Sequence, residues 1–217
     1  MFNSDIAFTA GGIIFLIFLV VVYAVDPFKW KPVKPTLNKE RNPGPLKECQ
    51  MLEEYIKGHK KVVFAGLTLN TVSVENYPLL ERLAREGETN FEFFLVDPSL
   101  GKQNPIFSTA ADNRGDGTTA EEIFTEAVKS VDRLKRIKAE AKNSKEVDIR
   151  VIRYAIGHSM VLVDPLKPEG KIQITLHSFN HTKGERLCFH LFPEDGSAYS
   201  NATSVYQDLL RNSISID

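Results

Sequence analysis

Hydrophobic residues form one continuous run near the N-terminus and a series of shorter, periodic runs in the rest of the chain. The N-terminal run, Ile6–Val25, contains twenty residues and no charge. A helix of that length rises about 30 Å, which matches the hydrocarbon core of a bilayer, whereas a helix in a soluble core rarely stays apolar on every face for so long. We therefore predict that Ile6–Val25 is a transmembrane helix that holds the chain in a lipid bilayer.

A cleaved signal peptide is the alternative interpretation of this run, with Val22-Tyr23-Ala24 as the cleavage site. No Lys or Arg precedes the run, and it exceeds the usual apolar core of a signal peptide, about 7–15 residues. Basic residues follow the run closely: Lys29, Lys31, Lys34, Lys39 and Arg41. By the positive-inside rule, we expect a single-pass protein of the inner or plasma membrane with its N-terminus outside and its C-terminal domain in the cytoplasm.

The pattern beyond the run predicts a linker and one domain. Residues 26–45 contain five prolines, which favour an extended, semi-stiff spacer. Residues 46–217 are enough for one globular domain with its own core. We thus divide the chain into an N-terminal tail and span (1–25), a juxtamembrane linker (26–45) and a cytoplasmic domain (46–217).

The first half of the domain alternates helical and strand patterns. In chain order, the expected elements are a helix over 46–57, a strand over Lys61–Leu69, a helix over Val74–Glu86 and a strand over Phe91–Val96. Strand, helix and strand in this order are typical of a parallel βαβ unit, whose ligands bind beyond the carboxyl ends of the strands. The loops after Leu69 and Val96 are therefore the first places to look for a site.

A long helix is expected after an irregular loop over residues 99–118. Thr118 or Thr119 would cap it, and its apolar stripe faces the core. The other face is basic, with Lys129, Arg133, Lys135, Arg136 and Lys138. We interpret this face as solvated helix surface, with contact to anionic lipid as the alternative.

Short strands dominate the second half. We expect strands over Ile149–Tyr154, Ser159–Val163, Lys171–Ser178 and Arg186–Phe192, the later ones antiparallel, and then a helix over Ala198–Leu210 and a polar tail. The predicted fold class is α/β, with a mixed β-sheet flanked by helices on both faces.

Composition excludes several classes of site. The net charge of −1 gives no global preference for nucleic acid, and the two cysteines, Cys49 and Cys188, are too few for a disulfide framework. His177 and His181 are four residues apart at a strand end, where that spacing creates no shared face for a metal. No Walker loop or Gly-x-Gly-x-x-Gly motif occurs. We expect neither a metal nor a cofactor.

Three segments, Phe64–Leu69, Phe93–Pro98 and Val151–Asp164, together with the order of elements, resemble the phospholipase D superfamily. The similarity is greatest to short, single-repeat bacterial members with degraded motifs, and it covers about residues 50 to 210. It implies the mixed sheet described above and a cleft for a phosphodiester.

The family signature is His-x-Lys, four residues and Asp, followed by a Gly-Ser strand with an Asn. The resemblance assigns His158 to the nucleophile position. Asp164 lies one residue before the position of the family's Asp. Ser178 and Asn180 match the later element faintly, and Arg153 and Lys171 are the remaining cations for a ligand. Met160 stands where the lysine belongs, and a thioether cannot stabilise the charge that develops on a phosphoryl group.

These residues lead to a functional hypothesis and its alternatives. We expect a membrane-anchored, catalytically degenerate sensor or effector that binds a phosphate-bearing ligand (nucleotide, nucleic acid or anionic lipid) or a partner. By analogy, its setting would be bacterial defence signalling. The alternative is a membrane-bound phosphodiesterase, a nuclease or phospholipase, that works as a homodimer with His158 as nucleophile. The third hypothesis is a membrane-anchored scaffold without a ligand, in which the His158 ring forms hydrogen bonds with backbone groups.

Overall fold

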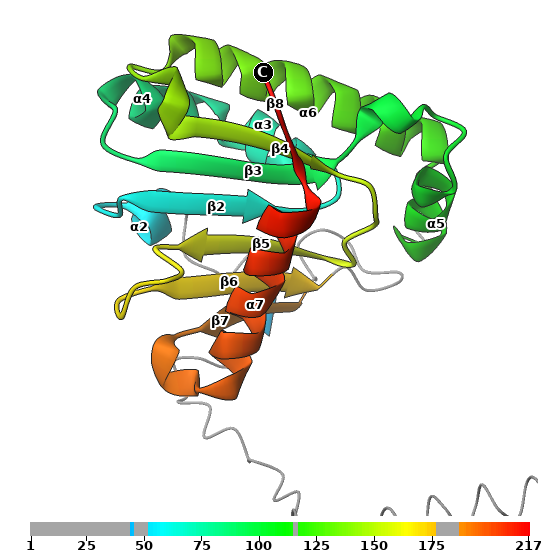
Figure 1. Cartoon of the computed structure of the whole chain (residues 1–217). Helices are drawn as coiled ribbons and strands as arrows, with labels where there is room; N and C mark the ends of the chain where they lie inside the picture. The colour runs from blue at the N-terminus through cyan, green and yellow to red at the C-terminus, as the bar shows by residue number, and fades with distance from the viewer. Residues whose placement is uncertain (1–43, 46–51, 115–116, 177–186) are drawn as a thin grey trace, which may run out of the picture. The chain divides into compact units, whose positions relative to one another are not determined.

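A computed structural model describes residues 44–45, 52–114, 117–176 and 187–217. Within these residues, one mixed β-sheet is flanked by helices on both faces, which confirms the predicted α/β class (Figure 1). No helix in these ranges is long and apolar enough to cross a membrane. The predicted span Ile6–Val25 lies outside the described residues, as does the linker up to residue 43.

The sheet has eight strands in the order β1-β7-β6-β5-β2-β3-β4-β8. Their bounds are β1 Gly44–Pro45, β2 Lys61–Ala65, β3 Asn90–Val96, β4 Val147–Ile152, β5 His158–Val163, β6 Lys171–Leu176, β7 Leu187–Leu191 and β8 Ile214–Ile216. Strands β2, β3 and β4 are parallel neighbours, which confirms the βαβ prediction. All other pairings are antiparallel, including β5 with β6 and β6 with β7, as the turn signals predicted.

Six α-helices lie in the described ranges. They are α2 Leu52–Ile56, α3 Asn70–Glu75, α4 Tyr77–Glu86, α5 Pro105–Arg114, α6 Ala120–Glu140 and α7 Ser197–Asn212, with short 3-10 turns at Pro98–Leu100, Ser144–Glu146 and Pro193–Asp195. Helix α7 crosses one face of the sheet, and α3, α4 and α6 cover the other (Figure 1). The predicted cap of α6 at Thr118 or Thr119 is Thr119, which forms a capping box with Glu122.

The helix predicted over Val74–Glu86 is two helices. Helix α3 begins earlier, at Asn70, and α4 begins after Asn76, with Pro78 in its first turn. Proline lacks an amide hydrogen, and its ring clashes with the carbonyl four residues before it, so one helix cannot continue from α3 through this position. The break therefore follows from Pro78, because proline is tolerated in the first turn of a helix.

The prediction of an irregular loop over residues 99–118 was wrong in part, because half of this segment, Pro105–Arg114, forms helix α5. Ile106, Phe107 and Ala110 are buried against Ile123 and Ala127 of α6. The rings of Phe107 and Phe124 meet edge to face, with centroids 5.5 Å apart. Polar residues dilute the apolar positions of this helix, so its stability comes from packing against α6 rather than from a strong periodic pattern.

The prediction of a tail without secondary structure after α7 was also wrong, because Ile214–Ile216 form strand β8. Ile216 and Ile214 pair with Ile149 and Val151 of β4. Ile216 is partly buried against the core, whereas Ile214 is 49% exposed. Three residues are too short for an alternating pattern to indicate a strand, and the exposed edge of β4 supplies the missing hydrogen-bond partners.

Alternate residues of each central strand face the two helical layers. On the α6 face, the rings of Phe64 (β2) and Phe93 (β3) stack with centroids 5.3 Å apart, and Phe91 lies beside them. On the α7 face, Tyr206 meets Phe94 edge to face. Tyr206 donates a hydrogen bond to Glu92 (2.7 Å), and burial raises the pKa of its hydroxyl to about 12. The central strands are thus fixed from both sides.

The packing of α5 can be tested with Phe107→Ala. Because Phe107 is fully buried, we expect the substitution to lower the free energy of unfolding by about 3–5 kcal/mol, measured by urea denaturation of the full-length chain. Thr109→Ala, at an exposed position of the same helix, is the control and should change stability by less than about 0.5 kcal/mol. Equal, small effects of both substitutions would show that this segment does not pack against α6.

Candidate functional site

The sheet brings several chain segments to one edge, formed by the carboxyl ends of β2, β3 and β4 and the start of β5 (Figure 1). Strand β5 runs antiparallel to β2, with Met160 opposite Ala65, so His158 lies beyond the end of β2. Residues 153–157 connect β4 to β5 and therefore cross the ends of β2 and β3. We call this region the carboxyl edge; it is the position where sheets with parallel strands bind ligands.

His158 is half-buried at the first position of β5. Burial lowers the pKa of its imidazole below the ordinary value of 6.5, because desolvation disfavours the charged ring. The ring is therefore neutral at pH 7, with one nitrogen as a donor and the other as an acceptor. By strand alternation, His158 shares the α7 face with Met160 and Leu162.

Arg153 lies at the end of β4, with a side chain that is 64% exposed. Its Nε is 3.4 Å from Oδ2 of Asp97, the residue that follows β3. Asp97 is buried, and its Oδ1 accepts a hydrogen bond from the backbone amide of Ser99 (2.9 Å). The guanidinium is thus anchored through one nitrogen by a fixed carboxylate, and its outer N–H groups stay available to an anion.

Asp97 was not among the predicted site residues, although the loop that it opens was singled out. The signal that identifies it is an Asp directly after a buried strand, where a carboxylate can accept a hydrogen bond from the backbone of the following turn.

Gly66 shapes the carboxyl edge because it has no side chain. A Cβ there would lie 3.1 Å from Oγ of Ser159, so glycine allows the loop after β2 to pass close to β5.

The predicted site residues do not all meet at this edge. Asp164 follows the far end of β5, and Lys171 pairs with Val163 there, opposite to the end that carries His158. The ammonium of Lys171 lies 4.3 Å from the centroid of the Tyr55 ring, and burial lowers its pKa. Ser178 and Asn180 lie outside the described residues. Of the predicted residues that the structure describes, His158 and Arg153 lie at the carboxyl edge.

Asp164 instead joins two turns at the opposite end of the sheet. It is 4% exposed, with Oδ2 3.0 Å from Nδ1 of His59 and Oδ1 3.0 Å from Nζ of Lys167. The backbone amide of Lys60 lies 3.4 Å from the same carboxylate. Although desolvation alone would raise the pKa of Asp164, these partners together lower it below 3.8. Its φ of 45° is left-handed, which Asp tolerates better than most residues.

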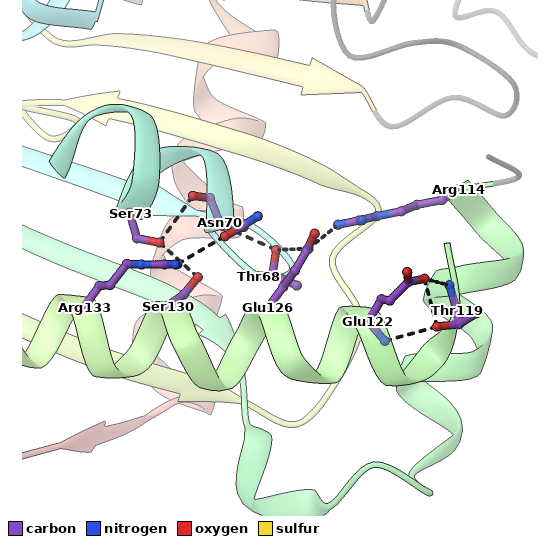
Figure 2. Close-up of polar contacts among 9 residues, drawn as sticks. All are labelled: Thr68, Asn70, Ser73, Arg114, Thr119, Glu122, Glu126, Ser130 and Arg133. Atoms are coloured by element: carbon purple, nitrogen blue, oxygen red, sulfur yellow. Dashed lines mark hydrogen bonds and ion pairs between the residues drawn. The ribbon is translucent and has the colours of Figure 1, made fainter. Parts of the chain in front are cut away.

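A second group of polar side chains lies on the α6 face, between the loop after β2, α3 and α6 (Figure 2). Thr68 and Arg114 both donate to Oε2 of Glu126, at 3.1 and 3.0 Å. Nη1 of Arg133 donates to Oδ1 of Asn70 (3.3 Å). These contacts border a cleft of about 460 Å³. No group of three or more metal-ligating side chains is found among the described residues, here or elsewhere.

Comparison of the chain with models of known protein families gives no match, and comparison with curated proteins gives none either.

The structural role of Asp164 can be tested with Asp164→Asn, which keeps the shape and tolerates the left-handed backbone but loses the charge. At pH 5 we expect the free energy of unfolding to fall by about 2 kcal/mol, the size of a hydrogen bond to a charged group. The folded-state pKa of Asp164 is lowered, so this contribution is present above the unfolded pKa and is lost as the pH falls through the folded pKa.

The difference between the two proteins should therefore shrink below about pH 4, in urea titrations at pH 5, 4, 3 and 2.5. A difference that stays constant over this range would contradict a charged Asp164 in the folded protein.

Proposed function

We propose that the domain is a phospholipase D-like module that binds a phosphate-bearing ligand at the carboxyl edge without hydrolysing it, and that Ile6–Val25 tethers it to the cytoplasmic face of a membrane. Such a protein would act as a sensor or effector. The environment of Met160 is the observation that carries the proposal.

Met160 is 1% exposed and packs with the apolar residues of the α7 face. Ile156, in the loop between β4 and β5, belongs to the same cluster. In the family that this chain resembles, the residue two positions after the histidine is the lysine that neutralises the phosphoryl oxygens. Here that position belongs to the hydrophobic core, and a cation there would have to be desolvated.

The remaining groups favour binding over attack. The neutral imidazole of His158 can donate one hydrogen bond to a phosphate oxygen, and the outer N–H groups of Arg153 can form a bidentate pair with two oxygens. Arg153 is the one predicted cation found at this edge, and transition-state stabilisation by a second charge is not apparent among the described residues. The ligand class is therefore a phosphate ester, either part of a nucleotide chain or a lipid headgroup.

The proposal is tested with the full-length chain in a mild detergent. The probes are a fluorescently labelled single-stranded DNA and vesicles that contain phosphatidylglycerol, and bis-p-nitrophenyl phosphate reports turnover. We expect binding of one probe without turnover. Arg153→Ala should weaken that binding about tenfold or more, because a charged hydrogen bond contributes about 1.5–3 kcal/mol. His158→Ala should weaken it less, because the neutral ring supplies a single uncharged donor.

Arg136→Ala is the matched control, because Arg136 is exposed on α6, on the opposite face of the sheet. It should leave binding unchanged. Turnover that disappears in His158→Ala would establish the phosphodiesterase alternative instead. Failure to bind either probe, or an equal loss in the control variant, would overturn the proposal.

Met160→Lys, which restores the family residue, tests whether the missing lysine alone separates this chain from an enzyme. We expect a loss of stability of about 3 kcal/mol or more, because the new charge is buried without a partner. Met160→Leu conserves volume and should cost less than about 1.5 kcal/mol. Urea denaturation of both variants provides the measurement. A stable Met160→Lys protein that hydrolyses bis-p-nitrophenyl phosphate would show that this position still faces a catalytic cleft.

A further inference from the structure

We propose that the cleft between α3 and the first half of α6 is a second anion-binding site, suited to a phosphomonoester with a hydroxyl-bearing remainder. It lies on the α6 face of the sheet, whereas His158 lies on the α7 face, and it shares no residue with the carboxyl-edge site. The inference therefore stands independently of the proposed function.

The cleft has a volume of about 460 Å³ and is polar. Its lining comes from Asn70 and Val74 of α3, Thr118 before α6, and Glu121, Glu122, Thr125, Glu126, Lys129 and Arg133 of α6. Such a volume is within the range of small-molecule sites.

Each carboxylate in the lining already has a partner. Glu126 accepts from Thr68 and from Arg114, which is itself largely buried (Figure 2). Glu122 accepts from the backbone amide of Thr119 at 2.7 Å within the capping box. Glu121 lies 3.3 Å from Nζ of Lys102. Glu126 and Glu121 are thus each paired with a cation, whereas Glu122 is engaged by uncharged donors of the capping box and keeps its charge at the start of the helix.

The two cations of the lining are not balanced in this way. Lys129 is exposed, and no described carboxylate lies within ion-pair distance of it. Arg133 is half-buried and donates to the neutral amide of Asn70, which directs its guanidinium toward α3 (Figure 2). The two residues are one helical turn apart, where like charges repel each other and destabilise a helix. An anion bound between them would relieve this repulsion.

The arrangement of polar groups indicates the class of anion. A guanidinium fork and an ammonium one turn apart suit the oxygens of a single phosphate group. Towards the start of α6, Thr125, Glu121 and Glu122 offer acceptors for hydroxyl groups, and their negative charge disfavours a second phosphate. A sugar phosphate or a nucleoside monophosphate has this chemistry, and a polyphosphate does not.

Isothermal titration calorimetry of the full-length chain in detergent tests the proposal with three probes: glucose 6-phosphate, AMP and inorganic phosphate. We expect at least one of the two esters to bind more tightly than inorganic phosphate. Arg133→Ala and Lys129→Ala should each raise Kd about tenfold or more, because each removes a charged contact. Arg133→Lys, which keeps the charge but loses the fork, should have an intermediate effect.

The matched control is the double variant Lys135→Ala, Arg136→Ala. It removes two exposed charges from the same helix outside the cleft and should leave Kd within twofold of the wild-type value. Thermal unfolding verifies that each variant is folded. In an Arg153→Ala background, which lacks the cation of the carboxyl edge, Arg133→Ala should still raise Kd about tenfold, which separates the two sites.

Three results would overturn the proposal: no binding of either ester, an equal loss of binding in the control variant, or a loss in Arg153→Ala without a loss in Arg133→Ala.

Discussion

The parallel pairing of β2, β3 and β4 is the constraint on which the rest of the structure depends. It is held by backbone hydrogen bonds and by the stacked rings of Phe64, Phe91 and Phe93 under α6. Parallel strands end at the same edge, so the residues that follow them, including Asp97 and Arg153, are brought together across positions far apart in the sequence. Strand β5 joins β2 in the opposite direction and adds His158 to this edge.

The same geometry separates the two ends of β5. A strand rises about 3.3 Å per residue, so six residues hold His158 and Asp164 well apart. Asp164 fixes the turns around His59 and Lys167, and His158 is left beside the ends of β2 and β3. Between them, Met160 belongs to the core. Among the described residues, this edge therefore holds His158 and Arg153, and an apolar methionine stands two positions after the histidine.

The sequence predicted the elements whose stability is local. The apolar runs of β2 and β3 and the cap at Thr118 or Thr119 can be recognised because hydrophobic spacing and side-chain caps act within a few residues. Helix α5 and strand β8 were missed, because α5 depends on Phe107 meeting Phe124 and β8 depends on the free edge of β4. Neither partner can be inferred from the segment itself.

The candidate site was predicted in part for the same reason. His158 and the loop after Val96 were identified, since strand ends are marked by local patterns. The separation of Asp164 and Lys171 from His158 depends on the direction and register of β5 and β6, which a single sequence does not specify. The cleft beside Asn70 and Arg133 was not predicted, because it forms only when α3 packs against α6. The basic face of α6 had suggested only solvated surface or contact with lipid.

The measurement that tests binding at the carboxyl edge most directly is an NMR titration of the His158 ring in the full-length chain, assigned by comparison with His158→Gln. Without a ligand, the pKa should lie below 6.5, because the ring is half-buried. A bound phosphate ester should raise it, because a nearby anion favours the charged imidazole, and Arg153→Ala should abolish the rise. A His158 pKa that is the same with and without saturating ligand would contradict phosphate binding at this edge.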